Sequence, residues 1–246
     1  MMGYLMASSL PTRPLESKAL DVQVSPGYDE YSLNNTCPQC PNSINSQWNM
    51  KGYGASASAV YALSDHWGIG VMGGYGHLSG VDFSGKNAYA NGTIASANII
   101  YDPFSGDNFR MPIIGGLGYR NLIENDASST LYNAQGFSYS AGIAPQFNTG
   151  FLRWTVFGYI ISGAPTVETL QVTNQGTTAL LKAPSVNTAS GGGISVIYRP
   201  LRFISFTYIP AWATQLGSNE SGSIYVFTFS HRFKMKSKTK KKDSEN

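Results

Sequence analysis

Two cysteines lie three residues apart in the stretch CPQC, as Cys37 and Cys40. In an oxidising compartment, two thiols at this spacing form a short disulfide, and this is the pairing that we expect. A zinc site would need two further ligands, and the sequence has no second cysteine pair and no histidine nearby. A thioredoxin-like redox role needs a βαβ context, which the neighbouring residues do not provide. The pair therefore favours a disulfide over a metal site or a redox site.

A histidine and a serine two residues apart form the second motif with chemical potential. His77 and Ser79 occur in the stretch HLS, and an imidazole beside a hydroxyl can activate it for acyl transfer. The motif is similar to that of the outer-membrane lipid A deacylases, which use a His and a Ser at this spacing with an acidic residue. That resemblance implies a lipid acyl hydrolase, with Asp82 or Glu124 as the acid. An ordinary histidine at a membrane interface is the alternative that we favour.

The composition indicates which kind of element carries these residues. Charged residues make up 13% of the 246-residue chain, against roughly 25% in soluble domains. Glycine (27) and tyrosine (15) are abundant, yet no uninterrupted apolar stretch reaches the ~18 residues of a membrane helix. In a membrane β-barrel only alternate residues face lipid, so the mean hydropathy stays modest. The composition therefore favours a transmembrane antiparallel β-barrel.

An alternation with a period of two runs along the whole chain and is the strongest signal in the sequence. In one stretch Tyr53, Ala55 and Ala57 share a face, and Gly54 and Ser56 occupy the other. We expect the large apolar residues to face lipid and the small ones to face a narrow interior. The alternation predicts ten strands, near residues 17–25, 49–63, 67–79, 88–102, 109–122, 136–147, 151–162, 188–199, 202–213 and 222–233.

The connections between these strands alternate in length. Short ones are expected at 64–66, 103–108, 148–150 and 199–202, and long ones at 26–48, 80–87, 123–135, 163–187 and 214–221. Short periplasmic turns and long extracellular loops are typical of outer-membrane barrels. We therefore predict an all-β, up-and-down barrel of about ten strands with both termini in the periplasm. Eight strands are the alternative, if the first hairpin is not part of the wall.

Several cationic residues fall on the inward side of the predicted strands. Arg110, Arg120 and Arg153 are expected to line the lumen, with Lys51 and Arg202 as further candidates. One interpretation is a network of ion pairs and hydrogen bonds that plugs the barrel, and the other is a basic constriction that favours anions. The inward acids that we expect are Asp21, Asp102 and Glu124.

Aromatic residues near the strand ends match the interfacial belts of membrane barrels. They are Tyr61, Trp67, Tyr101, Tyr119, Trp154 and Trp212. The stretches YALSDHWGIGVMGGYG and SIYVFTFSHRF resemble small bacterial outer-membrane β-barrels of the OmpA-like and porin-like families, over about 48–233. The second stretch resembles the final aromatic strand by which such proteins are recognised for insertion. The resemblance implies contact with the lipid bilayer and with lipopolysaccharide, at the bacterial cell surface.

The two ends of the chain are predicted to lie outside the barrel domain, which spans 17–233. Residues 1–16 are interpreted as a signal remnant or a disordered segment. Residues 234–246 hold six lysines and two acids, and they are interpreted as a disordered periplasmic tail. The tail is a candidate contact for peptidoglycan or another envelope protein. Nucleic acid is not expected, because no aromatic residue interleaves the lysines and the remaining chain is not basic.

The sequence leaves three functions open. We favour a non-enzymatic outer-membrane barrel with a structural, surface-display or partner-binding role. The second is a narrow porin or channel for small solutes or anions, and the third is a lipid A deacylase that depends on His77 and Ser79. No metal cluster, phosphate-binding loop or carboxylate pair stands out, so we expect neither a metal nor a cofactor.

Overall fold

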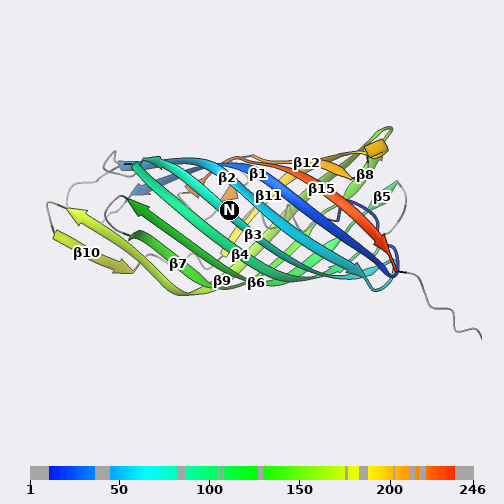
Figure 1. Ribbon diagram of the computed structural model, residues 1–246, viewed down its shortest axis with the longest axis horizontal. Coiled ribbons are helices and arrows are strands. Elements are labelled where there is room, and N and C mark those ends of the chain that lie inside the picture. The colour runs from blue at the N-terminus through cyan, green and yellow to red at the C-terminus, as the bar shows by residue number, and fades with distance from the viewer. Residues whose placement is uncertain are drawn as a thin grey trace, which may run out of the picture.

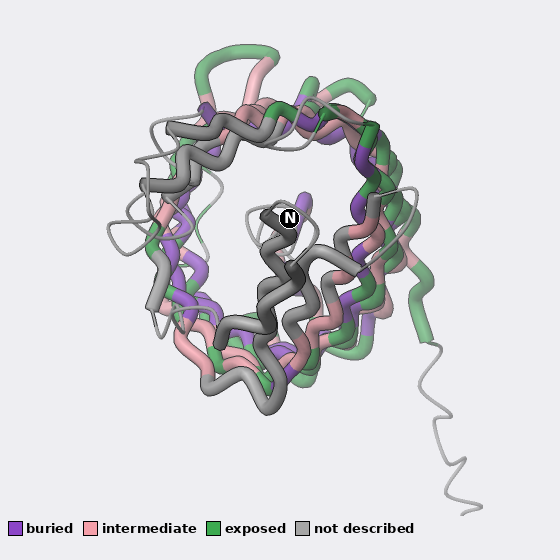
Figure 2. Tube along the Cα trace, turned by 90° about the vertical axis from the view of Figure 1, so that its left-hand side faces the viewer, coloured by how far each residue is buried: buried purple, intermediate pink, exposed green. Residues whose placement is uncertain are grey.

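The computed structural model describes residues 11–36, 45–81, 87–104, 106, 108–126, 130–174, 177–182, 188–201, 203–210, 214–215 and 220–235. Ten strands form the wall of a closed barrel, and the ring is seen in Figures 1 and 2. They are β1 (Ala19–Thr36), β2 (Asn45–Ala62), β3 (Trp67–Val81), β4 (Asn87–Tyr101), β6 (Ile113–Asp126), β7 (Thr130–Ile143), β9 (Leu152–Asn174), β11 (Thr188–Tyr198), β12 (Ile204–Ile209) and β15 (Ile224–Lys234).

Every wall strand pairs antiparallel with its neighbours, and the pairing of β1 with β15 and of β11 with β9 completes the ring. Because the ring is closed, each of the ten wall strands has a partner on both sides, which is the condition for strands to cross a lipid bilayer. The prediction of a ten-stranded antiparallel barrel is confirmed. The first predicted hairpin belongs to the wall, so the eight-stranded alternative is wrong.

Short elements extend the wall at both ends. At one end β5 (Phe109–Arg110) pairs with β8 (Gln146–Thr149), and a single 3-10 turn, η1 (Arg199–Leu201), joins β11 to β12. At the other end β10 (Thr177–Lys182) folds back on β9, and β13 (Thr214–Gln215) and β14 (Glu220–Ser221) pair with β11 and β1. We call these the short-turn end and the hairpin end; in Figure 1 they lie right and left. No helix in the described ranges is long and apolar enough to cross a membrane.

Much of what the sequence predicted as long loops is strand. β1 continues to Thr36 and β2 starts at Asn45, so most of the described part of the 26–48 connection is paired. The same holds for 163–187, where β9 and β10 form a hairpin. The physical reason is that an antiparallel ladder, once its register is set, continues wherever both chains stay extended. Pro26 has no N–H to donate, and the register of β1 with β15 skips Ser25 and Pro26, whereas the register with β2 continues through Ala55, so the strand does not end there.

The alternation of side chains is inverted relative to a soluble protein. On β3 the exposed positions carry Trp67, Ile69, Val71 and Tyr75, and the positions between them are largely glycine. Large apolar side chains stay exposed around the barrel, with Tyr53 at 74%, Leu117 at 70% and Phe137 at 70%. Serine and threonine side chains are buried inside. Buried apolar side chains accompany them, so the interior is mixed, whereas the apolar outer band suits a lipid environment.

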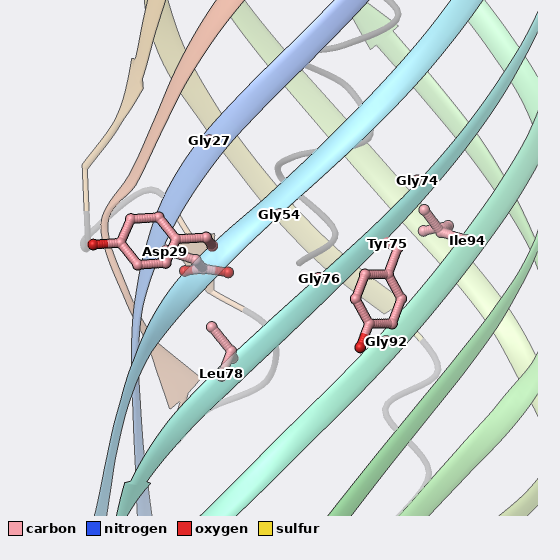
Figure 3. Close-up of a pocket in the computed structure, with 10 residues that line it drawn as sticks. Gly27, Asp29, Gly54, Gly74, Tyr75, Gly76, Leu78, Gly92 and Ile94 are labelled. Carbon is pink, nitrogen blue, oxygen red and sulfur yellow. The ribbon is translucent and has the colours of Figure 1, made fainter.

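A row of glycines crosses four neighbouring strands on the inner face. Gly27, Gly54, Gly76 and Gly92 are successive register partners on β1, β2, β3 and β4 (Figure 3). About half-way around the ring, β9 carries Phe157, Tyr159 and Ile161, all buried in the interior core. A ten-stranded barrel has a narrow interior, so large side chains on one wall require small ones on the other.

Candidate functional site

The short-turn end of the interior holds a buried ion pair. Arg110 donates its Nε–H to Asp102 at 2.7 Å, and its Nη2 lies 2.5 Å from the same carboxylate oxygen. The two side chains are 1% and 0% exposed. The Gln146 side-chain oxygen lies 3.4 Å from Nη1 of Arg110, and the Met111 backbone N–H donates to Asp102 at 3.3 Å. A guanidinium–carboxylate pair with these extra partners satisfies the hydrogen-bonding groups that burial removes from water.

A second network joins the first and last strands of the barrel, β1 and β15, at the short-turn end. Asp21 on β1 and Arg232 on β15 are direct register partners, and Arg232 donates to both Asp21 oxygens at 2.7 and 2.5 Å. Arg232 also donates to Glu16 at 3.1 Å and to the Pro14 carbonyl oxygen at 2.6 Å. Lys234 lies 2.6 Å from Glu16, and this hydrogen bond is the main cause that lowers the pKa of the Glu16 carboxyl from 4.5.

The segment 11–18 packs against the inner wall. The Gln146 side-chain amide donates to the Pro11 carbonyl oxygen at 3.1 Å, and Thr12 donates to the Ser230 hydroxyl at 3.1 Å. Leu15 is buried in one cluster with wall residues that include Val60, Ala62, Ile100 and Ile114. The chain then turns into β1 at Lys18, which has a φ of 64° and donates its N–H to the Ala62 carbonyl oxygen. The segment therefore occupies interior space at the short-turn end.

A cavity of about 440 Å³ remains beside this segment. Its lining comes from the segment and from strand ends: Thr12, Arg13, Pro14, Leu15, Glu16, Arg153, Ile197, Arg199, Arg232 and Lys234. Arg153 donates to the Asn148 side-chain oxygen at 2.9 Å, and Arg199 donates to the Gly150 carbonyl oxygen at 3.1 Å. Gly150 has a φ of 59°, which favours glycine in this turn. Five basic side chains and one acidic side chain thus converge on the cavity.

The predicted inward arginines are distributed over three places. Arg110 is in the buried pair, Arg153 lines the cavity, and Arg120 is half-buried on β6, where its register partners are Ile94 and Gly136. A lumen-lining role in ion passage stays a prediction for all three. Of the inward acids that we expected, Asp21 and Asp102 are buried, whereas the Glu124 side chain is outside the described part of the chain.

Lys51 points outward, so its predicted inward position is wrong. Its side chain is 66% exposed and lies 3.3 Å from Glu30. Lys51 has the same strand parity as Tyr53, and successive side chains of a strand point to opposite faces. Arg202 is outside the described residues.

His77 and Ser79 lie on the outer face of β3, and both are exposed. The His77 Nδ1 is 2.9 Å from the Asn91 side-chain oxygen, which also accepts the Tyr75 hydroxyl at 2.7 Å. The imidazole also stacks with Tyr89, at a centroid distance of 6.4 Å. The geometry around His77 thus contains an amide and two tyrosines. The side chains of the proposed acids, Asp82 and Glu124, are outside the described part of the chain, and the catalytic role stays a prediction.

Four of the six predicted interfacial aromatics lie at the short-turn end of the wall, and Tyr119 lies near the middle of β6. Trp67 and Tyr101 are register partners at the short-turn end, with ring centroids 4.4 Å apart. Tyr61 and Trp154 are half-buried there, and Trp154 donates its indole N–H to Thr149 at 2.7 Å. Tyr119, further toward the hairpin end, donates to Gln135 at 3.2 Å and packs edge-on against Phe137. Their membrane-interface role stays a prediction, and Trp212 lies outside the described residues.

Cys37, Cys40, residues 1–10 and the tail from 236 also lie outside the described residues. The disulfide and the disordered tail therefore stay predictions. In the ranges that are described, no group of three His, Cys, Asp or Glu side chains could hold a metal ion.

Four features of this site were not predicted from the sequence: Glu16, Arg199, Arg232 and the segment 11–15. A signal existed for Arg232, because it shares strand parity with Thr228 and Ser230, which are buried. The segment 11–15 has no alternation, and two of its five residues are proline, so no periodic pattern indicated its packing.

No family model and no curated protein matches this sequence. Among solved structures, the translocator domain of the autotransporter NalP from Neisseria meningitidis is similar, with 11% identity, 94% of each chain covered and a TM-score of 0.53. The transport unit of the autotransporter AIDA-I from Escherichia coli has 13% identity, 94% and 97% coverage and a TM-score of 0.45. OprG from Pseudomonas aeruginosa has 11% identity, 90% and 99% coverage and a TM-score of 0.42. The closed ring, the apolar outer band and the first of these likenesses together show that the chain has the fold of a bacterial outer-membrane β-barrel.

Proposed function

We propose that this chain is a non-enzymatic protein of the bacterial outer membrane, blocked at its short-turn end, that presents its long hairpins to partners at the cell surface. The short-turn end and both termini face the periplasm. The outer wall contacts the lipid bilayer and lipopolysaccharide, and the barrel serves as a membrane anchor rather than as a permanently open channel.

The observation that carries this proposal is the attachment of the segment 11–16 inside the barrel. Interior side chains from β8 and β15 bind it at Pro11, Thr12, Pro14 and Glu16. Leu15 adds apolar contact with the wall. A chain segment bound at four points along its length and packed in a narrow lumen leaves little room for a continuous water path.

Ion conductance of the refolded, full-length barrel in a planar bilayer tests the proposal. We expect no stable conductance steps from the wild-type protein. A matched variant that lacks residues 1–16 keeps β1 and the whole wall, and it should conduct. Stable steps from a wild-type barrel whose fold has been verified by circular dichroism would contradict the blocked state.

A narrow channel with a preference for anions is the second candidate. It is favoured by the basic cavity at the short-turn end, where five cationic side chains stand against one carboxylate. In this case the wild-type steps would show a reversal potential on the anion side in a salt gradient. That selectivity should weaken in Arg153→Gln, and the outward Lys51→Gln should leave it unchanged.

Surface display has its own test. On intact cells, added protease should cleave the β9–β10 hairpin, which spans 169–182, before it cleaves the wall. If this hairpin resists protease on cells that contain the barrel, the result opposes a display role. If protease cleaves at the short-turn end instead, the proposed orientation is reversed.

A further inference from the structure

The cavity beside the segment 11–16 has the composition of an anion site. It is lined by four arginines and a lysine, and Glu16 is the only acid in this lining. Asp21, just outside the lining, pairs with Arg232. With both carboxylates counted, the group has a formal charge of +3. We propose that this cavity binds a small phosphoryl anion of the phosphate or pyrophosphate class.

The hydrogen bonds of two arginines support this assignment. Arg153 donates to an amide oxygen of Asn148, and Arg199 donates to the backbone carbonyl oxygen of Gly150. Both of these oxygens are neutral acceptors, and both arginine side chains line the cavity. Planar guanidinium groups match the oxygens of phosphate in paired hydrogen bonds, which a lysine does not do.

Two of the other three cations are held by a carboxylate. Arg232 and Lys234 both bind Glu16, at 3.1 and 2.6 Å, and the Lys234 and Glu16 side chains are 72% and 44% exposed. An anion that enters the cavity competes with the Glu16 carboxylate for these two cations. Glu16 therefore weakens binding, and Arg153 and Arg199 strengthen it.

The size of the cavity is consistent with a polyatomic anion. Its volume of about 440 Å³ is within the ~300–1,000 Å³ range of small-molecule sites. Chloride would fill a small part of it and would contact few of the five cations. A free phosphoryl solute and the headgroup of an anionic lipid present the same chemistry, and the experiment separates these two sources.

The test is an isothermal titration calorimetry experiment, in which inorganic pyrophosphate is added to the refolded full-length protein in a zwitterionic detergent at low salt. We expect saturable binding that weakens as sodium chloride is added, because salt screens exposed charges. The double variant Arg153→Gln with Arg199→Gln should bind at least about 10-fold more weakly. Lys51→Gln removes one charge from the outer face and should not change the dissociation constant. Glu16→Gln should tighten binding, and a merely structural role for Glu16 would not produce that direction.

Lipid vesicles form the second arm. If vesicles of phosphatidylglycerol do not compete with pyrophosphate for the cavity, the result supports a free solute as the natural ligand. Competition by phosphatidylglycerol, and none by phosphatidylcholine, supports a lipid headgroup as the source. The proposal is overturned if neither probe shows saturable binding. It is also overturned if the arginine double variant and Lys51→Gln bind equally well while their circular dichroism spectra match. None of these results depends on whether the barrel conducts.

Discussion

The two ends of the barrel interior are filled in different ways. At the short-turn end, large charged side chains pair with each other, and the segment 11–16 adds a length of backbone. Further along, the inner face of β1–β4, which we call the glycine wall, combines glycine and serine with apolar side chains such as Met72 and Ile94. The opposite strand β9 adds Phe157, Tyr159 and Ile161. Both regions lie inside the same ring of strands, so the difference comes from the residues and not from the architecture.

The contrast shows what each solution needs. A buried charge is tolerated only with a partner at close range and further hydrogen bonds, as Asp102 and Arg110 have. The glycine wall needs no partners, because it removes side chains instead of pairing them. The charged end should therefore lose the most free energy when one partner is removed, and the glycine wall should be sensitive to added volume.

Removal of one charge at the short-turn end should have the largest effect. Asp102→Ala leaves the fully buried Arg110 without its carboxylate, and we expect a loss of about 3–5 kcal/mol in the free energy of unfolding. Chemical unfolding of the refolded barrel, followed by tryptophan fluorescence, measures it. The exposed pair of Lys51 and Glu30 is the internal control, and Lys51→Ala should cost no more than about 1 kcal/mol.

A second control separates charge from shape. Asp102→Leu combined with Arg110→Met removes both charges and keeps side-chain volume, so most of the lost stability should return. If Asp102→Ala were as stable as the wild type, water would be solvating Arg110, and the contrast between the two ends would fail.

Added volume on the glycine wall should have an intermediate effect. A Cβ at Gly52 would overlap the His77 backbone oxygen and come within 2.7 Å of the Leu78 Cα. We expect Gly52→Ala to cost about 1–3 kcal/mol, because backbone must move to accept it. At Gly73, on the outer face of β3, the nearest atom to a Cβ is the Ile94 backbone oxygen at 3.8 Å, so Gly73→Ala should be close to neutral. Equal unfolding midpoints for the two variants would show that close approach of β2 and β3 does not constrain the wall.

The wall could be predicted from sequence because a strand has a fixed period. The alternation of Ala55 and Ala57 with Ser56 and Ser58 assigns both faces without knowledge of the partners. The same rule places Lys51 on the outer face, because its position on the strand has the parity of Tyr53. The predicted inward position was wrong because it was inferred from the charge of the side chain and not from this parity. The ends of the strands were less predictable, since hydrogen-bond pairing extends β1 past Pro26 and β9 past Pro165.

The candidate site was less predictable than the wall. The segment 11–16 binds residues of β8 and β15, which follow it by more than a hundred positions, and no local pattern encodes such contacts. Arg199 lies in a turn, where parity gives no direction. The sequence thus supplied single cations but not the cavity in which they converge.

Removal of one neutral hydroxyl from the interior should have a smaller effect. Ser25 and Thr228 share a hydrogen bond of 2.9 Å across β1 and β15, next to Pro26, which has no N–H to donate. Ser25→Ala leaves an unpaired neutral hydroxyl on Thr228, and we expect a loss of about 0.5–1.5 kcal/mol. Thermal unfolding in detergent measures it. A loss as large as that of Asp102→Ala would show that neutral and charged pairs in the interior contribute equally to stability, so the two ends of the barrel would not differ in this way.

Acidification should loosen the segment 11–16 before it affects the wall, which is the smallest change that we expect. The hydrogen bond from Lys234 lowers the pKa of Glu16 from 4.5, so the attachment is complete above pH 4.5 and is lost as the pH falls through the lowered value. Amide hydrogen exchange of residues 12–18, corrected for the intrinsic pH dependence of exchange, should rise in that window while exchange in β3 stays constant. Glu16→Gln cannot form the ion pair, so its exchange should already be faster at neutral pH and should show no transition. If wild type and Glu16→Gln exchange alike across the window, the segment is held by Pro11, Thr12 and Leu15 alone, and the charged network does not fix it.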